Sequence, residues 1–195
     1  MKAKFYLIVC ICILLGFNTL FGQKNEKLNK YLEMFNIQYS MPNGYLESDS
    51  SLVIYNKSGH RVGSSVYKLI AQKDSIAILF RFNGPIDTSK NLTGFIGVDG
   101  KQFDPNKNYR PSKTEYTTFS DSYTTKIYNA DVSGTYNLQV SEKNHILNSG
   151  EKCKVIFIHK DNKVDIELFY FYNKSSEPQL NKHLKRTRKM LRFKN

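Results

Sequence analysis

The chain has 195 residues, of which 40% are hydrophobic, and it holds 13 Phe and 13 Tyr, so the material for a hydrophobic core is present. This length suits one domain with one core and excludes two ordinary domains. The formal charge is +12, but residues 180–195 carry seven basic residues and no acid, so much of the positive charge is concentrated at the C-terminus.

Residues 1–22 have the layout of a secretory signal peptide. Two lysines precede an uninterrupted apolar run at residues 5–15, which is shorter than the ~20 residues of a membrane-spanning helix. We therefore expect cleavage near Gly22 and an exported protein that is periplasmic, envelope-associated or extracellular, with no transmembrane span after cleavage. An uncleaved membrane anchor and a lipoprotein attached through Cys10 are the alternatives.

The expected mature chain is one α+β domain at residues 23–195 with a charge of +10, because the signal holds two lysines and no acid. It keeps Cys153 as its one cysteine and can form no internal disulfide, so packing must hold the fold together. Helical spacing of apolar residues at 25–35 predicts an opening helix. Alternation at 35–39 then predicts a strand that ends in the turn 41–44, and a further strand is expected at 52–55.

Two β-hairpins are expected, at residues 66–82 and 153–172. In each, the proposed register gathers apolar side chains on one face and leaves a more mixed set on the other. The expected pairs are Ala71 with Ile76, Leu69 with Ile78, Tyr67 with Phe80, Val155 with Leu168, Phe157 with Ile166 and His159 with Val164.

The chain between the hairpins is less regular. Residues 83–113 are rich in Gly, Pro, Asn, Asp and Lys, and there only 95–98 resembles a brief strand. The Thr- and Tyr-rich segment 116–128 is compatible with strand structure. A turn at 133–134 is expected to precede a strand at 135–140.

A helix is expected to close the domain. Ser176 as N-cap, with Gln179 three residues later, resembles a capping box, and Pro178 is tolerated in the first turn. Its inward stripe would consist of Leu180, Leu184, Thr187 and Leu191. The fold class expected is α+β, an antiparallel β-sheet of hairpins flanked by an N-terminal and a C-terminal helix.

A search for chemistry identifies no catalytic, cofactor or metal residues. Cys153 and His159 lie six residues apart on one expected strand, which separates them by roughly 20 Å and excludes a thiol–imidazole pair. No histidine stands two or four residues from another His or Cys, as a local zinc site would require. The protein is therefore expected to need no cofactor.

The basic terminal helix is the one feature that favours a function. An apolar stripe with a dense positive surround suits an anionic envelope surface or an acidic protein partner, and the same pattern also suits a packing helix with a charged outer face. Nucleic acid is not expected, because the protein is exported and the basic run lacks interleaved aromatic residues. The candidate binding residues are Lys182, Lys185, Arg186, Arg188, Lys189, Arg192 and Lys194.

The hairpin at 152–172, followed by a helix ending in Met190-Leu191-Arg192-Phe193, resembles the closing strand-strand-helix of PsbP-like domains. The segment Tyr39-Ser40-Met41-Pro42-Asn43-Gly44-Tyr45 is similar to the strand and turn with which those domains open. The likeness departs at 83–128. It implies an accessory or binding domain without catalytic residues, and no site residue can be carried over from it.

Two functions therefore stand as hypotheses. The first is a non-catalytic exported domain that binds a macromolecule or an anionic surface through the terminal helix. The second is a small hydrolase or ligand-binding protein with a site in the loops at 83–128, where polar groups could converge. Its candidate residues are Asp99, Asp104, Tyr109 and Arg110.

Overall fold

Seven strands form one antiparallel sheet in the order β2-β5-β6-β10-β9-β8-β7 within the residues that the computed structural model describes, 26–48, 51–84, 116–147 and 151–195. The central strands β6 and β10 are almost entirely buried, as expected for strands covered on both faces. The strands are β2 (Leu46–Ser48), β5 (Tyr67–Ala71), β6 (Ile76–Asn83), β7 (Tyr116–Thr118), β8 (Val132–Leu138), β9 (Lys152–Lys160) and β10 (Val164–Tyr172).

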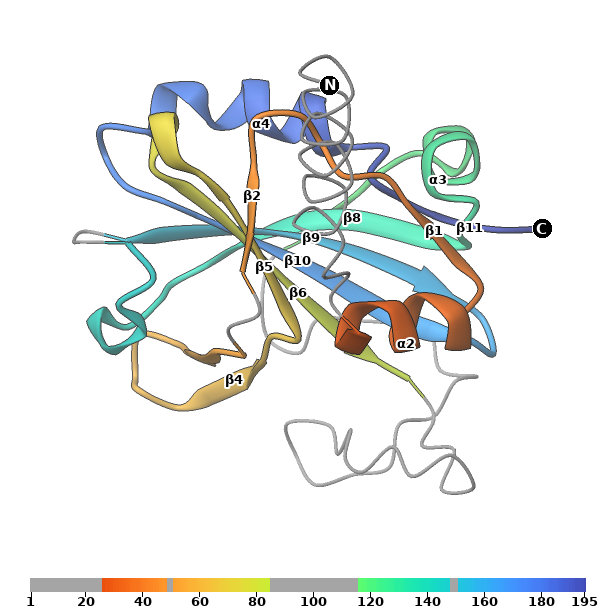
Figure 1. The fold of residues 1–195 in the computed structure, drawn as a ribbon, viewed down its shortest axis with the longest axis horizontal. Coiled ribbons are helices and arrows are strands. Elements are labelled where there is room, and N and C mark those ends of the chain that lie inside the picture. The colour runs from red at the N-terminus through yellow and green to blue at the C-terminus, as the bar shows by residue number, and fades with distance from the viewer. Residues whose placement is uncertain (1–25, 49–50, 85–115, 148–150) are drawn as a thin grey trace, which may run out of the picture.

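The remaining elements cover the two faces of this sheet (Figure 1). The larger core lies between one face and the helices, together with the β1–β11 pair. A smaller core lies on the other face beneath the β3–β4 pair. These elements are α2 (Glu26–Met34), α3 (Asp121–Tyr128), α4 (Leu180–Thr187), β1 (Ile37–Tyr39), β3 (Val53–Tyr55), β4 (Arg61–Ser64), β11 (Leu191–Phe193) and the short 3₁₀ turns η1 (Gln72–Asp74), η3 (Glu142–Asn144) and η4 (Glu177–Gln179).

The expected α+β class is confirmed, with an antiparallel sheet and helices near both ends of the described chain. The β5–β6 hairpin has the predicted register, with Ala71 opposite Ile76 and Tyr67 opposite Phe80. The opening helix and the strand after it also form where expected. None of the helices in the described ranges is both long and apolar enough to cross a membrane.

The predicted register of the β9–β10 hairpin is wrong by one residue. Its loop takes three residues, because Asn162 adopts φ +57° and the Lys163 N–H donates to the Lys160 carbonyl over 3.1 Å. His159 therefore pairs with Asp165 rather than with Val164. A one-residue slip moves every side chain to the opposite face, and both faces could accept it because both are buried.

Two expectations for the segment after residue 115 are also wrong. Residues 121–128 form helix α3 instead of a strand, because the Ser120 hydroxyl accepts from the Tyr123 N–H at 3.3 Å and Asn129 ends the helix at φ +52°. Ser133 and Gly134 lie inside β8 rather than in a turn. Gly134 is needed there, since a Cβ would collide with the Thr117 carbonyl of the neighbouring strand.

The terminal helix is shorter than expected and begins without the capping box. The Ser176 hydroxyl accepts from the Asn173 N–H at 2.9 Å and does not cap a helix. Helix α4 ends at Thr187, and Leu191 belongs to β11. The buried Leu191 thus reaches the core by pairing with Tyr39 of β1, which no local pattern encodes.

Candidate functional site

A basic groove lies between the β1–β2 loop and the end of α4. Antiparallel pairing places Tyr39 opposite Leu191, and the Ser40 N–H donates to the Met190 carbonyl at 2.8 Å, so the segments flanking these strands run side by side. The groove measures about 620 Å³ and opens to solvent. No carboxylate is among its described lining residues, which are Ser40, Met41, Pro42, Asn43, Gly44, Arg186, Lys189 and Met190.

Four of the seven candidate cations form one exposed series along α4 and the turn after it, and two of them, Arg186 and Lys189, line this groove. Lys182, Lys185, Arg186 and Lys189 follow one another at helical spacing and are exposed. None of them forms an ion pair with another residue of the described ranges. Like charges three or four residues apart disfavour a helix by a few tenths of a kcal/mol per pair, so their grouping gives the isolated helix no stability.

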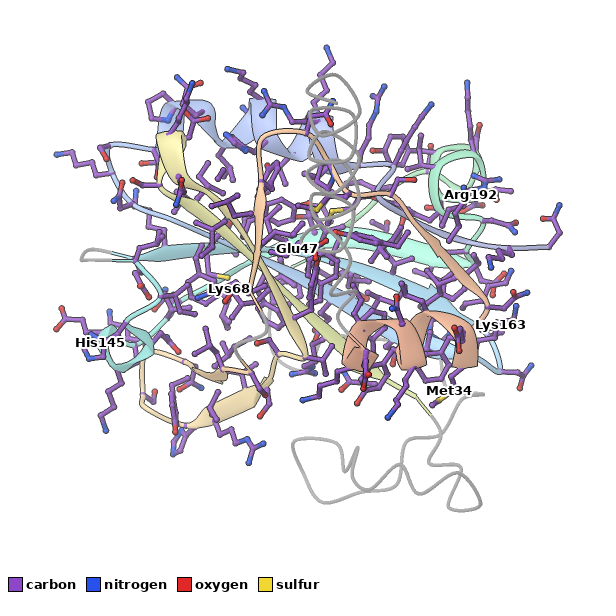
Figure 2. The ribbon with its side chains drawn as sticks, viewed as in Figure 1. Met34, Glu47, Lys68, His145, Lys163 and Arg192 are labelled. Atoms are coloured by element: carbon purple, nitrogen blue, oxygen red, sulfur yellow. The ribbon has the colours of Figure 1, made fainter. Side chains whose placement is uncertain are left out.

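The other three candidates lie elsewhere. Arg192 extends from β11 toward α3 (Figure 2), where it donates to the carbonyl of Lys126 and so satisfies the C-terminus of that helix. Arg188 lies close enough to Tyr128 to affect the pKa of that phenol. Lys194 follows β11, and its N–H donates to the Asn36 carbonyl at 2.8 Å. The candidate surface is therefore reduced to Lys182, Lys185, Arg186 and Lys189.

A chain of buried polar groups fixes α4 beneath these cations. His183 is fully buried, and its Nε2 is hydrogen-bonded to an Asp74 carboxylate oxygen at 2.8 Å, while its Nδ1 is hydrogen-bonded to the Tyr45 hydroxyl. This hydrogen bond lowers the pKa of Asp74, and burial raises the pKa of Tyr45 to about 12. The sequence had indicated only that His183 stood on the basic helix. Its partners are 109 and 138 residues away along the chain.

Thr187 anchors the next turn of the helix. Its hydroxyl donates to the His183 carbonyl at 2.8 Å and also contacts the Tyr170 hydroxyl of β10 at 2.7 Å. Arg186 therefore stands between two buried attachment points, at 183 and 187. Gly44 faces it across the groove at φ +81°, a conformation that favours glycine, and a Cβ there would lie 3.5 Å from an Arg186 Nη atom.

A second buried polar cluster holds the opposite face of the sheet. Arg81 Nε and a Glu167 carboxylate oxygen form an ion pair of 2.7 Å, and both side chains are buried almost completely. Glu167 also accepts from the Tyr136 hydroxyl at 2.8 Å, and Arg81 donates to the Val62 carbonyl of β4 at 2.6 Å. The cluster attaches the β3–β4 pair to the sheet.

A third cluster closes the tip of the β9–β10 hairpin. The buried His159 ring contacts Asp165 at 2.5 Å through Nδ1 and Asp161 at 2.8 Å through Nε2. Burial by itself lowers the pKa of His159, but the hydrogen bond to Asp165 and its charge outweigh this, so the pKa is raised. With both ring nitrogens occupied, His159 is a structural group. Its strand places it far from the buried Cys153, as the sequence predicted.

This raised pKa predicts a pH-dependent stability. A histidine whose folded pKa exceeds the unfolded value of 6.5 stabilises the fold fully below pH 6.5, and this stabilisation is lost as pH rises through the folded pKa. The free energy of unfolding should therefore decrease from about pH 6.5 upward. We expect His159→Gln to flatten this decrease in urea titrations, and the exposed His60→Gln to leave it unchanged. A profile identical in His159→Gln and the wild type would contradict the assignment.

The described residues contain no group of His, Cys, Asp and Glu side chains able to hold a metal ion. The alternative site residues, Asp99, Asp104, Tyr109 and Arg110, and the expected strand at 95–98 lie outside the described residues. No family model matches this chain, and neither the curated proteins nor the solved structures contain a significant match to it.

Proposed function

We propose that this protein is an exported, non-catalytic domain that binds an anionic envelope surface through the basic side of α4. The observation that carries the proposal is the grouping of Lys182, Lys185 and Arg186 of α4 with Lys189 of the turn that follows it, all exposed and without ion-pair partners among the described residues. The signal-peptide pattern of residues 1–22 supports the proposed location.

The polar clusters beneath the surface support a binding role over a catalytic one. His183 is fully buried and its partner Tyr45 is only 6% exposed, and neither they nor Asp74 is among the described residues that line the groove. The charged side chains that do line it are the cations Arg186 and Lys189. A rigid helix carrying several cations attracts an anionic bilayer by about 1 kcal/mol for each residue near it.

Charge reversal on α4 tests the proposal. We expect Lys182→Glu/Lys185→Glu to weaken binding to vesicles containing phosphatidylglycerol by about 30-fold or more at low salt, since two attractive charges become repulsive. Wild-type binding should also decrease with added salt and be absent on pure phosphatidylcholine. Vesicle co-sedimentation measures all three. Removing the whole tail would be less informative, because Leu191 and Phe193 belong to the core.

The chain offers a matched control. Lys27 and Lys30 of α2 are exposed and have the same three-residue spacing, but α2 lies well apart from α4 over the same face of the sheet (Figure 1). Lys27→Glu/Lys30→Glu changes the net charge by the same amount, so it separates a local surface from overall basicity. Equal loss of vesicle binding in both double variants would refute α4 as the binding surface.

A further inference from the structure

The groove beside α4 contains more than diffuse positive charge, and we propose that it is a binding site for the phosphate group of a phosphate ester, with Arg186 and Lys189 as the cationic contacts. This inference rests on the proposed function in that it names the ligand class of the same surface. The site is nevertheless a separate claim from surface binding. It depends on Arg186 and Lys189, which line the groove together with residues 40–44, and not on the summed charge of the helix.

The first argument is the composition of the groove. Its two cations are accompanied by the neutral polar residues Ser40 and Asn43, and no carboxylate is among the described lining residues. The Asp74 carboxylate, which lies outside the lining but within electrostatic range of Arg186, is hydrogen-bonded to His183. Its volume of about 620 Å³ lies in the range of small-molecule sites, roughly 300–1,000 Å³. Met41, which is 37% exposed, and Pro42 supply apolar surface for the organic part of an ester.

The second argument is the fixed position of Arg186. The buried attachments of His183 and Thr187 hold the backbone on either side of it, and Tyr45, the partner of His183, directly follows the Gly44 wall of the groove. The hydrogen bond between Tyr45 and His183 therefore connects the β1–β2 loop to α4, and these are the two segments on either side of the groove. With its backbone position fixed, Arg186 can present two parallel N–H donors to a phosphate, which an ammonium cannot do.

Conservative substitution distinguishes such a site from diffuse attraction. Arg186→Lys keeps the charge and removes the two-donor fork, whereas Lys30→Ala removes an exposed charge from α2, outside the groove lining. When glycerol 3-phosphate is titrated into the full-length protein and followed by NMR, we expect Arg186→Lys to raise the Kd about tenfold and Lys30→Ala to change it less than about twofold. The reverse order would overturn the inference and leave diffuse binding as the explanation.

Vesicles distinguish the possible sources of the phosphate. If glycerol 3-phosphate displaces the protein from phosphatidylglycerol vesicles, the groove binds a phosphate ester whether it is free or part of a lipid. If the protein binds the soluble ester but not the vesicles, the site stands and the proposed surface function fails. If it binds vesicles while the soluble ester neither binds nor competes, the site is refuted and the surface function stands. The circular dichroism spectrum of each variant checks that it is folded.

Discussion

Arg81→Met should destabilise the protein by about 3–5 kcal/mol, because it removes the Arg81 guanidinium from the buried Glu167 carboxylate. Tyr136 remains as a hydrogen-bond donor to that carboxylate, but a neutral hydroxyl does not balance the charge. The same change removes the bond from Arg81 to the Val62 carbonyl, so the β3–β4 pair should also detach more easily. Urea unfolding followed by tyrosine fluorescence measures the loss.

Two further variants make this prediction specific. Replacing both partners, in Arg81→Met/Glu167→Leu, should recover most of the stability, because no uncompensated charge then remains in the core. The exposed pair Lys152–Glu177, at 2.8 Å with side chains about half exposed, is the matched control, and Lys152→Met should leave the free energy of unfolding nearly unchanged. A comparable loss in Arg81→Met and Lys152→Met would contradict the role assigned to the buried pair.

His183→Ala should destabilise the protein by about 2–4 kcal/mol and weaken anion binding as well. The substitution opens a cavity under α4 and leaves the buried Tyr45 hydroxyl without a partner. It also releases Asp74, which ties the helix to the β5–β6 turn. Because Arg186 is only three residues further along the helix, its position should become less defined. Tyr45→Phe, which removes only the hydroxyl, should cost less than about 2 kcal/mol.

The Asp74 carboxylate gives this prediction a pH signature. The hydrogen bond from His183 lowers the pKa of Asp74 below its usual 3.8, so the bond stabilises the fold at pH values above 3.8. That stabilisation is lost as pH falls through the folded pKa. Asp74→Asn should therefore reduce stability near neutral pH and weaken its decline in acid, which thermal unfolding at several pH values can measure. An unchanged acid profile would contradict the coupling.

The errors of the sequence-based reasoning share a physical cause. The β5–β6 register was predictable because it gathers Tyr67, Leu69 and Phe80 on a wholly apolar face and leaves the charged Lys68 and Arg81 on the other. In β9–β10 both faces are buried, so hydrophobicity did not distinguish neighbouring registers, and the backbone of Asn162 decided. As a result His159 meets Asp165, a pair that the predicted register placed on opposite faces. Helix α3 was missed because its apolar content is low and its caps are single residues.

The sequence by itself determined the α+β class, the first hairpin, the amphipathic α2 and the location of the cations near the C-terminus, since each depends on local periodicity or composition. The tertiary structure alone decided which of those cations share a surface. Pairing of β1 with β11 brings residues 40–44 beside 186–190, and burial of His183 orients α4. These contacts join segments more than 100 residues apart. The packing of the sheet decides which residues meet, and a short stretch of sequence carries no information about such distant partners.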